Sequence, residues 1–168
     1  MEYSIRALAP EDLRDVNEIR SMRGVMETIP TLFSESLSHT ESVMQSFGKN
    51  DHMLAAEIYT ENGSKVIGMG GLHVAAKHRM RHSADISLIV HTNYQNMGIG
   101  RAILTQLLEL ADKWLLLKRV ELEVAAENSG AIHLYESLWF EKEGLKKYAS
   151  ITEGRYTDII VMGRYRNI

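Results

Sequence analysis

The sequence contains no cysteine. This absence excludes structural disulfides, thiolate metal ligands and a covalent acyl-cysteine intermediate together. The chain also lacks a long apolar run, because its most apolar later stretch, residues 114–117, is flanked by Lys113 and Lys118. Its first residues hold no apolar segment of the signal-peptide type. We therefore expect a soluble, cytoplasmic protein that does not act at a membrane.

The chain has no strong charge of either sign. Its 168 residues carry a formal net charge of -3, and 24% of them are charged. Without a basic field the protein has little with which to hold a polyphosphate chain, so nucleic acid is not expected as the main partner. The length fits one domain over residues 1–168, and a hydrophobic fraction of 45% is that of an ordinary globular protein.

The spacing of apolar residues predicts the order of strands and helices. Asn62 and Gly63 between two apolar runs are typical of a hairpin turn, and an amphipathic helical stripe runs from Ile99 to Trp114. Strands are predicted over residues 3–7, 52–59, 65–73, 84–90, 119–124, 146–150 and 156–164, and helices from residue 10, over 35–47, from residue 99 and over 128–138. This order predicts an α/β sandwich around a mixed sheet.

The segment between the central strand and the amphipathic helix contains two glycines. It consists of Gln95, Asn96, Met97, Gly98, Ile99, Gly100 and Arg101. Residues without side chains let a ligand approach the backbone, and the first amides of a helix have no internal acceptor. The segment can therefore bind an anion such as phosphate. The alternative is an ordinary strand-to-helix turn with a convenient pair of glycines.

Two other kinds of phosphate loop fit the sequence less well. The P-loop pattern of nucleotide hydrolases is absent. A dinucleotide-binding fingerprint would need glycine or alanine where Ile103 stands, although Glu121 and Glu123 lie at about the distance expected for a ribose-binding acid. That fold also predicts further strand-helix units, and only one short helix follows.

A second group of residues lies 33 positions after Gln95, where Asn128 begins a predicted short helix. Ala131 and Tyr135 are four residues apart and share a face of that helix, with Asn128 at its start. A small residue leaves room for a thioester, and a phenol beside it can donate a proton. Taken singly, Asn128 is more simply a helix cap and Tyr135 a core residue.

Together, these motifs resemble the GNAT superfamily of N-acetyltransferases, and in particular its bacterial members that acetylate free amino acids or small amines. The family's pyrophosphate loop reads Gln or Arg, two residues, Gly, one residue, then Gly or Ala, and Gln95, Gly98 and Gly100 match it. The resemblance implies a mixed, mostly antiparallel sheet of about seven strands with helices on both faces. It also implies acetyl-CoA as co-substrate, no metal, and direct attack of an amine on the thioester.

The resemblance assigns cofactor-binding roles to several residues. The backbone of Leu88, Ile89 and Val90 would bind the pantetheine arm, and the amides of residues 97–101 would hold the pyrophosphate. Asn128 would reach the pantetheine from the other side, beside Ala131. Tyr135 is the candidate acid that protonates the departing thiolate.

The amine must lose a proton before it attacks, and three residues are candidate bases. Asp85, His73 and Glu123 all lie on predicted strands near the expected cleft, and each could act directly or through water. For the two acids, a solvated or salt-bridged strand residue is the simpler interpretation.

The acceptor site is the least defined part of the prediction. Arg79 or Arg81, beside His82, could bind the carboxylate of an amino acid, and Pro30 and Phe33 could line an apolar acceptor pocket. An exposed basic connection and a packed loop are the simpler alternatives. The spacing of His78 and His82 is weak evidence for a metal site, because the segment is predicted to be a loop.

The sequence thus predicts transfer of an acetyl group to the primary amine of a small molecule, with a free L-amino acid as the favoured acceptor. Acetylation of a polyamine or of a protein N-terminus is an alternative. A domain that binds acyl-CoA as a sensor without turnover is another, although Tyr135 favours catalysis. The resemblance further implies a homodimer, formed through the C-terminal strands.

Overall fold

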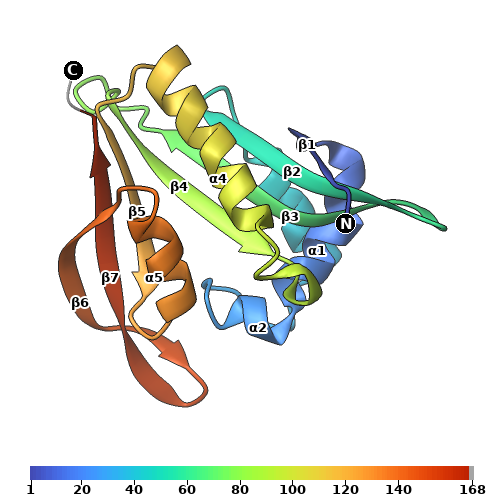
Figure 1. Cartoon of the computed structure of the whole chain (residues 1–168). Coiled ribbons are helices and arrows are strands. Elements are labelled where there is room, and N and C mark those ends of the chain that lie inside the picture. Colours follow the sequence, from blue (N-terminus) through green and yellow to red (C-terminus); the bar gives the residue numbers. More distant parts are fainter. Residues whose placement is uncertain (167–168) are drawn as a thin grey trace.

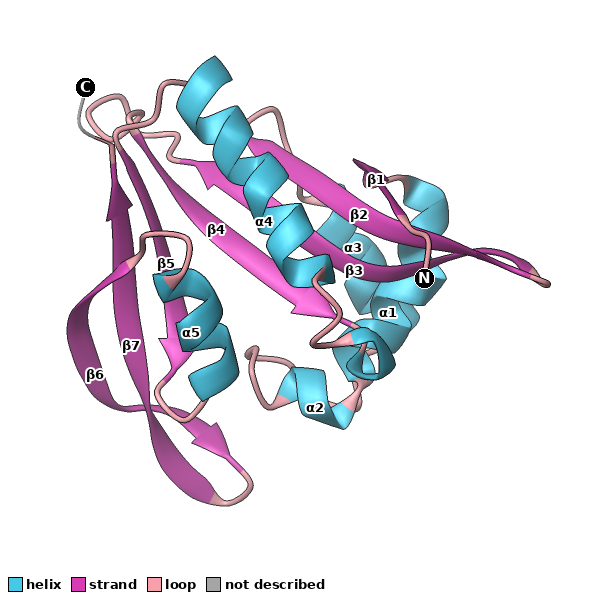
Figure 2. Cartoon of the chain, viewed as in Figure 1, coloured by secondary structure: helices cyan, strands magenta, loops and turns pink. Residues whose placement is uncertain are grey.

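The computed structural model describes residues 1–166, which form one seven-stranded sheet with helices on both faces (Figure 1, Figure 2). The strands lie in the order β1, β2, β3, β4, β5, β7, β6, and only the β4–β5 pair is parallel. The strands are β1 (Ser4–Ala7), β2 (Asp51–Thr60), β3 (Gly63–Val74), β4 (Ser83–Val90), β5 (Arg119–Ala125), β6 (Glu141–Thr152) and β7 (Arg155–Tyr165). The helices are α1 (Leu13–Ser21), α2 (Arg23–Met26), α3 (Leu37–Gln45), α4 (Ile99–Glu109) and α5 (Ser129–Glu136). The predicted fold class is confirmed.

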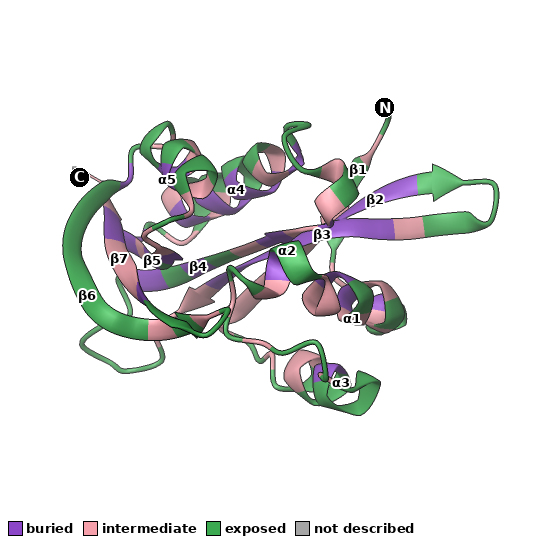
Figure 3. Cartoon of the chain, turned by 90° about the horizontal axis from the view of Figure 1, so that it is seen from below, coloured by how far each residue is buried: buried purple, intermediate pink, exposed green. Residues whose placement is uncertain are grey.

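The helices cover the two faces of the sheet unequally. Figure 3 shows α4 and α5 on one face, with α1 and α2 on the other and α3 outside α1. Ile103 and Leu107 of α4 belong to the larger buried cluster, whereas Val16 and Ile19 of α1 belong to a smaller one. Since side chains alternate along a strand, the strands supply both cores at once. This three-layer arrangement leaves the middle of the sheet between helices on both sides.

The two central strands separate along most of their length. β4 and β5 pair only through Ser83–Arg119, Ala84–Val120 and Asp85–Glu121. In contrast, β3 stays paired with β4 up to Val90, and β7 with β5 up to Ala125. The sheet therefore forks after Asp85, and from residue 86 onward β4 has no partner strand on its β5 side (Figure 1).

Several predicted boundaries differ from the structure. The helix predicted over 35–47 is the shorter α3, and the four-residue α2 lies in a segment without clear periodicity. β6 extends well beyond the predicted 146–150 on an exposed edge. Trp114 was expected in the buried stripe after α4 but is 76% exposed. The helix ends in a π-helical turn, Leu110–Trp114, whose wider spacing rotates Trp114 out of the stripe. Within residues 1–166, no helix is long and apolar enough to cross a membrane.

A buried ion network joins β1, β2 and the turn before α1. Arg6 donates to both carboxylate oxygens of Asp12 and to Glu57, each at 2.8 Å. Burial alone would raise the pKa of Asp12, but hydrogen bonds from Arg6 and the Ala9 amide outweigh it and hold the pKa below its usual value. Hydrogen bonding to Arg6 likewise lowers the pKa of Glu57. Both groups therefore stabilise the fold above the ordinary carboxylate pKa and lose that contribution as the pH falls.

We expect Arg6→Met to lower the free energy of unfolding at pH 7 by about 3 kcal/mol, because it leaves two buried carboxylates without their partner. The deficit should shrink as the pH falls towards about 4, where the carboxylates of the variant can be protonated. Urea unfolding of both proteins across this pH range measures the effect. Arg14→Met, at an exposed position on α1, is the matched control and should change stability little. An equal deficit at every pH would contradict the account.

Candidate functional site

The open edge of β4 presents backbone groups to the fork. The amide of Ala75 donates to the Ser83 carbonyl, and the amide of His91 donates to the Ile67 carbonyl. These two bonds fix the alternation of the β3–β4 ladder, so odd-numbered residues of β4 bond to β3 and even-numbered ones face the fork. The backbone amides and carbonyls of Leu88 and Val90 are therefore directed into the opening between β4 and β5. The Val90 carbonyl there accepts from the Gln95 side chain at 3.1 Å.

This alternation corrects one sequence expectation. Ile89 was expected to offer backbone groups to the pantetheine arm together with its two neighbours. It pairs with Met69 of β3, and its side chain is buried against α1. Its amide and carbonyl are therefore directed towards β3 rather than the fork.

The glycine-containing segment after β4 forms a helix N-terminus with unpaired backbone amides. Gly98 begins α4 as its N-cap at φ 84°, in the left-handed region, and Asn96 also has a positive φ of 59°. The first helical bond runs from the Ala102 amide to the Gly98 carbonyl. Among residues 1–166, the amides of 97–101 have no hydrogen-bond acceptor. Unpaired amides at a helix N-terminus attract an anion both as donors and through the helix dipole.

Gly100 brings this terminus against the open strand edge. A Cβ atom at Gly100 would lie 3.0 Å from Leu88 Cδ2, and 3.6 Å and 3.7 Å from side-chain carbons of Leu134 and Val90. The first turn of α4 thus lies directly beside Leu88 and Val90, whose backbone groups face the fork. Except for the Val90 carbonyl, which Gln95 occupies, the backbone groups of Leu88 and Val90 and the amides of 97–101 are unpaired within the described residues and lie on the same side of the fork. An extended molecule with an anionic end would fit along this track.

Helix α5 borders the other side of the fork. The Asn128 side chain accepts from the Ala131 amide at 3.1 Å, so it caps α5 while its own amide nitrogen has no partner among the described residues. Tyr135 is buried, and its ring contacts Phe140 edge-on with centroids 5.8 Å apart. Burial raises the pKa of Tyr135 to about 12, so the phenol is protonated at neutral pH. No hydrogen bond from its hydroxyl is formed within residues 1–166.

The three candidate bases lie on the opposite face of the sheet, on the side of α1. Burial, together with the negative charges of Glu121 and Glu123, raises the pKa of Asp85. Glu123 forms an ion pair with Lys146. His73 contacts Asp51 of β2 and Ser87 of β4, two residues that the sequence analysis did not select. The fork therefore has a tyrosine on one face and a titratable cluster on the other.

The basic connection before β4 is not brought to this site. Arg79, Arg81 and His82 are exposed and precede Ser83, whereas the glycine-containing segment follows the other end of the same strand. At about 3.3 Å per residue, roughly 17 Å separate Ser83 from Leu88. These residues therefore cannot hold the carboxylate of a small amino acid whose amine lies at the fork. Within the described part of the chain, no three His, Asp or Glu side chains gather as a metal site.

Pro30 and Phe33 lie in the exposed segment between α2 and α3, and Phe33 is 76% exposed. Helix α2, just before this segment, contacts the turn that follows β4, because a Cβ at Gly24 would lie 3.0 Å from the Thr92 side chain. Arg23 of α2 also bonds Glu153 in the β6–β7 turn. Helix α2 thus lies between the turn that follows β4 and the β6–β7 turn, and the predicted acceptor segment continues from it.

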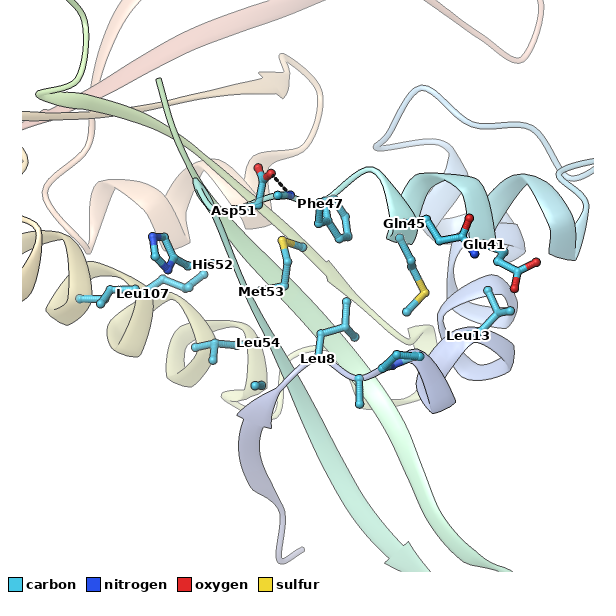
Figure 4. A pocket seen from close by; sticks show the side chains of 16 residues that line it. Leu8, Leu13, Glu41, Gln45, Phe47, Asp51, His52, Met53, Leu54 and Leu107 are labelled. Carbon is cyan, nitrogen blue, oxygen red and sulfur yellow. Dashed lines mark hydrogen bonds between the residues drawn. The ribbon is translucent and has the colours of Figure 1, made fainter. Parts of the chain in front are cut away.

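A separate apolar pocket of about 590 Å³ lies at the β1 edge of the sheet (Figure 4). Leu8, Leu13, Met53 and Leu54 line it together with α3 side chains. Asp51 lies at its border, where it accepts from the Gly48 amide. The pocket does not include the open edge of β4.

A sheet that forks between two parallel strands, with a glycine-containing helix N-terminus beside the fork, is typical of the N-acetyltransferases. The chain belongs to the acetyltransferase (GNAT) family, whose family model matches residues 22–140. It is 30% identical over 126 residues to the L-amino acid N-acetyltransferase AaaT of Escherichia coli strain K12, covering 70% of this chain and 78% of that protein. It is 25% identical to the spermidine N(1)-acetyltransferase of Vibrio cholerae, covering 99% of this chain and 96% of that protein.

Solved structures agree with this assignment. A GNAT-family acetyltransferase from Streptococcus pneumoniae matches with a TM-score of 0.79 and 26% identity, over 98% of this chain and 100% of that chain. The spermidine N-acetyltransferase of Vibrio cholerae in complex with CoA and spermine matches with a TM-score of 0.82 and 26% identity, over 97% and 95% of the two chains. The protein is therefore an N-acetyltransferase of a family that transfers acetyl groups from acetyl-CoA to amines.

Proposed function

We propose that this protein transfers an acetyl group from acetyl-CoA to the primary amine of a small molecule, which attacks the thioester directly in a ternary complex. The observation that carries the proposal is the track formed by the edge of β4 that has no partner strand and by the unpaired amides of 97–101. That track matches an extended arm with a diphosphate at one end. We propose further that residues 1–168 function as one domain, as the single sheet supports.

Each part of the track has a proposed role. The amides of 97–101 hold the pyrophosphate, and Leu88 and Val90 bind the pantetheine arm as an added strand would. The Leu88 amide also polarises the thioester carbonyl as negative charge develops on its oxygen. The free amide nitrogen of Asn128 contacts the arm from α5, and Tyr135 hydrogen-bonds to the departing sulfur.

A free L-amino acid is the first candidate acceptor, supported by the likeness to AaaT. A polyamine is the second, and a specific observation favours it. Asp85, Glu121 and Glu123 lie on the α1 side of the fork, which we call the acceptor face. Glu121 is paired with Arg119 and Glu123 with Lys146, whereas Asp85 forms no ion pair within residues 1–166. The Asp85 carboxylate attracts a molecule with several ammonium groups and repels a carboxylate.

A thiol-release assay with acetyl-CoA and a panel of amino acids, polyamines, aminoglycosides and N-terminal peptides tests the proposal. We expect at least one primary amine of the first two classes to be acetylated. Bound CoA with no amine acetylated would instead support a non-catalytic sensor, and acetylation of peptides alone would support the protein N-terminal alternative. A cytoplasmic location and a homodimer stay predictions of the sequence.

Kinetics of the Asp85→Asn variant distinguish a polyamine acceptor from an amino acid acceptor. If the acceptor is a polyamine, the loss of one carboxylate should raise the Michaelis constant for spermidine about threefold to tenfold, since a partly exposed charge contributes about 1 kcal/mol. The constant for acetyl-CoA should not change. Glu41→Gln, at an exposed position on α3, is the control. An unchanged constant for spermidine would remove the electrostatic argument for a polyamine.

A further inference from the structure

Three side chains from three neighbouring strands form a hydrogen-bonded row on the acceptor face of the sheet. Asp51 of β2 is the cross-strand partner of His73 on β3, and its Oδ1 atom lies 2.6 Å from His73 Nδ1. On the other side of the ring, His73 Nε2 lies 3.1 Å from the Oγ atom of Ser87 on β4. A carboxylate can only accept, so Nδ1 carries hydrogen, and in the neutral ring Nε2 accepts from the Ser87 hydroxyl.

The row depends on a position without a side chain. Ser87 is the cross-strand partner of Gly71, not of His73, so the imidazole reaches it by lying diagonally across Gly71. A Cβ atom at Gly71 would lie 2.7 Å from His73 Nε2. Phe47 contacts the ring from outside, with centroids 6.0 Å apart. The histidine is therefore fixed by its two hydrogen bonds and by the space that Gly71 leaves.

The negative charge of Asp51 lies at one end of the row and suits a role for His73 as proton acceptor. Burial alone would raise the pKa of Asp51, but hydrogen bonds from the Gly48 amide and from His73 outweigh it and lower the pKa. Asp51 is thus ionised at neutral pH, and its carboxylate accepts the hydrogen of His73 Nδ1. The charged groups that face the imidazole are Asp51 from β2 and Asp85 from β4.

Ser87, at the other end of the row, lies at the fork. Pairing between β4 and β5 ends at Asp85, so Ser87 is the next side chain on this face, where β4 is already unpaired. It directly precedes Leu88, whose backbone faces the opening. An amine that approaches the thioester from the acceptor face therefore passes Ser87. The other candidate bases are less free, because Glu123 is paired with Lys146 and Asp85 lies where the strands are still joined.

We propose that Ser87, His73 and Asp51 form a proton relay that deprotonates the acceptor amine, an inference that rests on the proposed acetyl transfer. The ammonium group gives a proton to Ser87 Oγ as the hydroxyl hydrogen passes to His73 Nε2, which yields a neutral amine and an imidazolium. The nitrogen lone pair then forms the bond to the carbonyl carbon, the carbon-sulfur bond breaks, and its electron pair goes to sulfur. The second nitrogen proton leaves to solvent. Asp51 acts as a positioning residue.

The test measures kcat/KM against pH for the wild type and for His73→Gln, Ser87→Ala and Asp51→Asn, with spermidine and L-methionine as amine probes together with the best acceptor of the panel. The affinity for CoA, measured by calorimetry, reports whether each variant is folded. His52→Gln, on the other face of β2, is the matched control. Gly71→Ala displaces the ring without changing any group of the relay, and because its Cβ would also lie 2.5 Å from Met53 Sδ, its stability is measured beside its activity.

We expect His73→Gln to lower kcat/KM about 100-fold at neutral pH while CoA binding is kept. The variant should also lose the fall in kcat/KM towards low pH, which is the acid limb of the wild-type profile. Ser87→Ala and Gly71→Ala should cause smaller losses, and Asp51→Asn should move the acid limb, which a merely structural role would not do. An unchanged profile in His73→Gln would overturn the relay, and so would an acetylated Ser87 found by mass spectrometry without acceptor, because serine would then be the nucleophile. If the wild type binds no CoA or acetylates no amine, the proposed function fails instead.

Discussion

Replacing Gly98 with valine is expected to weaken the binding of CoA about 100-fold. Gly98 has φ 84°, a conformation that β-branched residues rarely adopt, so valine would force the N-cap of α4 to change shape. The amides of 97–101 would then no longer converge on one anion. Loss of two hydrogen bonds to a charged group costs about 3 kcal/mol, which corresponds to the expected factor.

Isothermal titration with CoA measures the effect, and two further variants show its cause. Gly63→Val at the β2–β3 turn is the matched control, because Gly63 also has a positive φ and open space around it. It should lower stability without changing the affinity for CoA. Gly98→Asn tolerates the left-handed conformation, so it should bind CoA better than the valine variant. Equal affinities in Gly98→Val and Gly63→Val would show that CoA binds elsewhere.

The order of strands and helices could be predicted because it depends on local periodicity. The alternation along β4 and the helical stripe of α4 are both visible in the sequence, and so is the glycine-containing segment between them. Trp114 was placed in the wrong environment because one π-helical turn changes the phase of the stripe. No sequence signal marks such a turn.

The partners of His73 could not be predicted for a similar reason. The Asn62-Gly63 turn sets a register in which Thr60 pairs with Gly63 and Glu57 with Val66, and its continuation would place Asp51 opposite Leu72. A β-bulge between Ala56 and Glu57 shifts the register by one residue. Because side chains alternate, that single step brings Asp51 and His73 to the same face.

The assignment of Arg79 and Arg81 to the acceptor site, in contrast, could have been excluded on the sequence alone. Both precede the central strand, and the glycine-containing segment follows it. The two ends of a strand of eight residues are roughly 20 Å apart, which is too far for one small acceptor to reach from the fork to the arginines.

Tyr135→Phe is expected to lower kcat about 100-fold and to change the affinity for acetyl-CoA less than twofold. The substitution keeps the ring that packs against Phe140 and removes only the hydroxyl, which has no hydrogen-bond partner within residues 1–166. A single well-placed donor to developing negative charge contributes about this factor. Single-turnover rates with saturating acetyl-CoA measure the chemical step, and Tyr3→Phe, at the other end of the sheet, is the control.

The pKa of Tyr135 also decides how the hydroxyl acts. Burial raises that pKa to about 12, whereas an ordinary thiol has a pKa of about 8.5, so full transfer of the proton to the thiolate would be uphill by about 5 kcal/mol. We therefore expect Tyr135 to donate a hydrogen bond to the sulfur as the carbon-sulfur bond breaks, rather than to give up its proton. Because a phenol with a pKa of about 12 is still almost fully protonated at pH 10, the ratio of the wild-type and Tyr135→Phe rates should be constant between pH 7 and pH 10. A ratio that falls as the pH rises within this range would mean that the phenol ionises and that its environment is less buried than the structure indicates. An equal loss of binding and turnover in the variant would mean that the hydroxyl holds acetyl-CoA in the ground state and does not act on the leaving group.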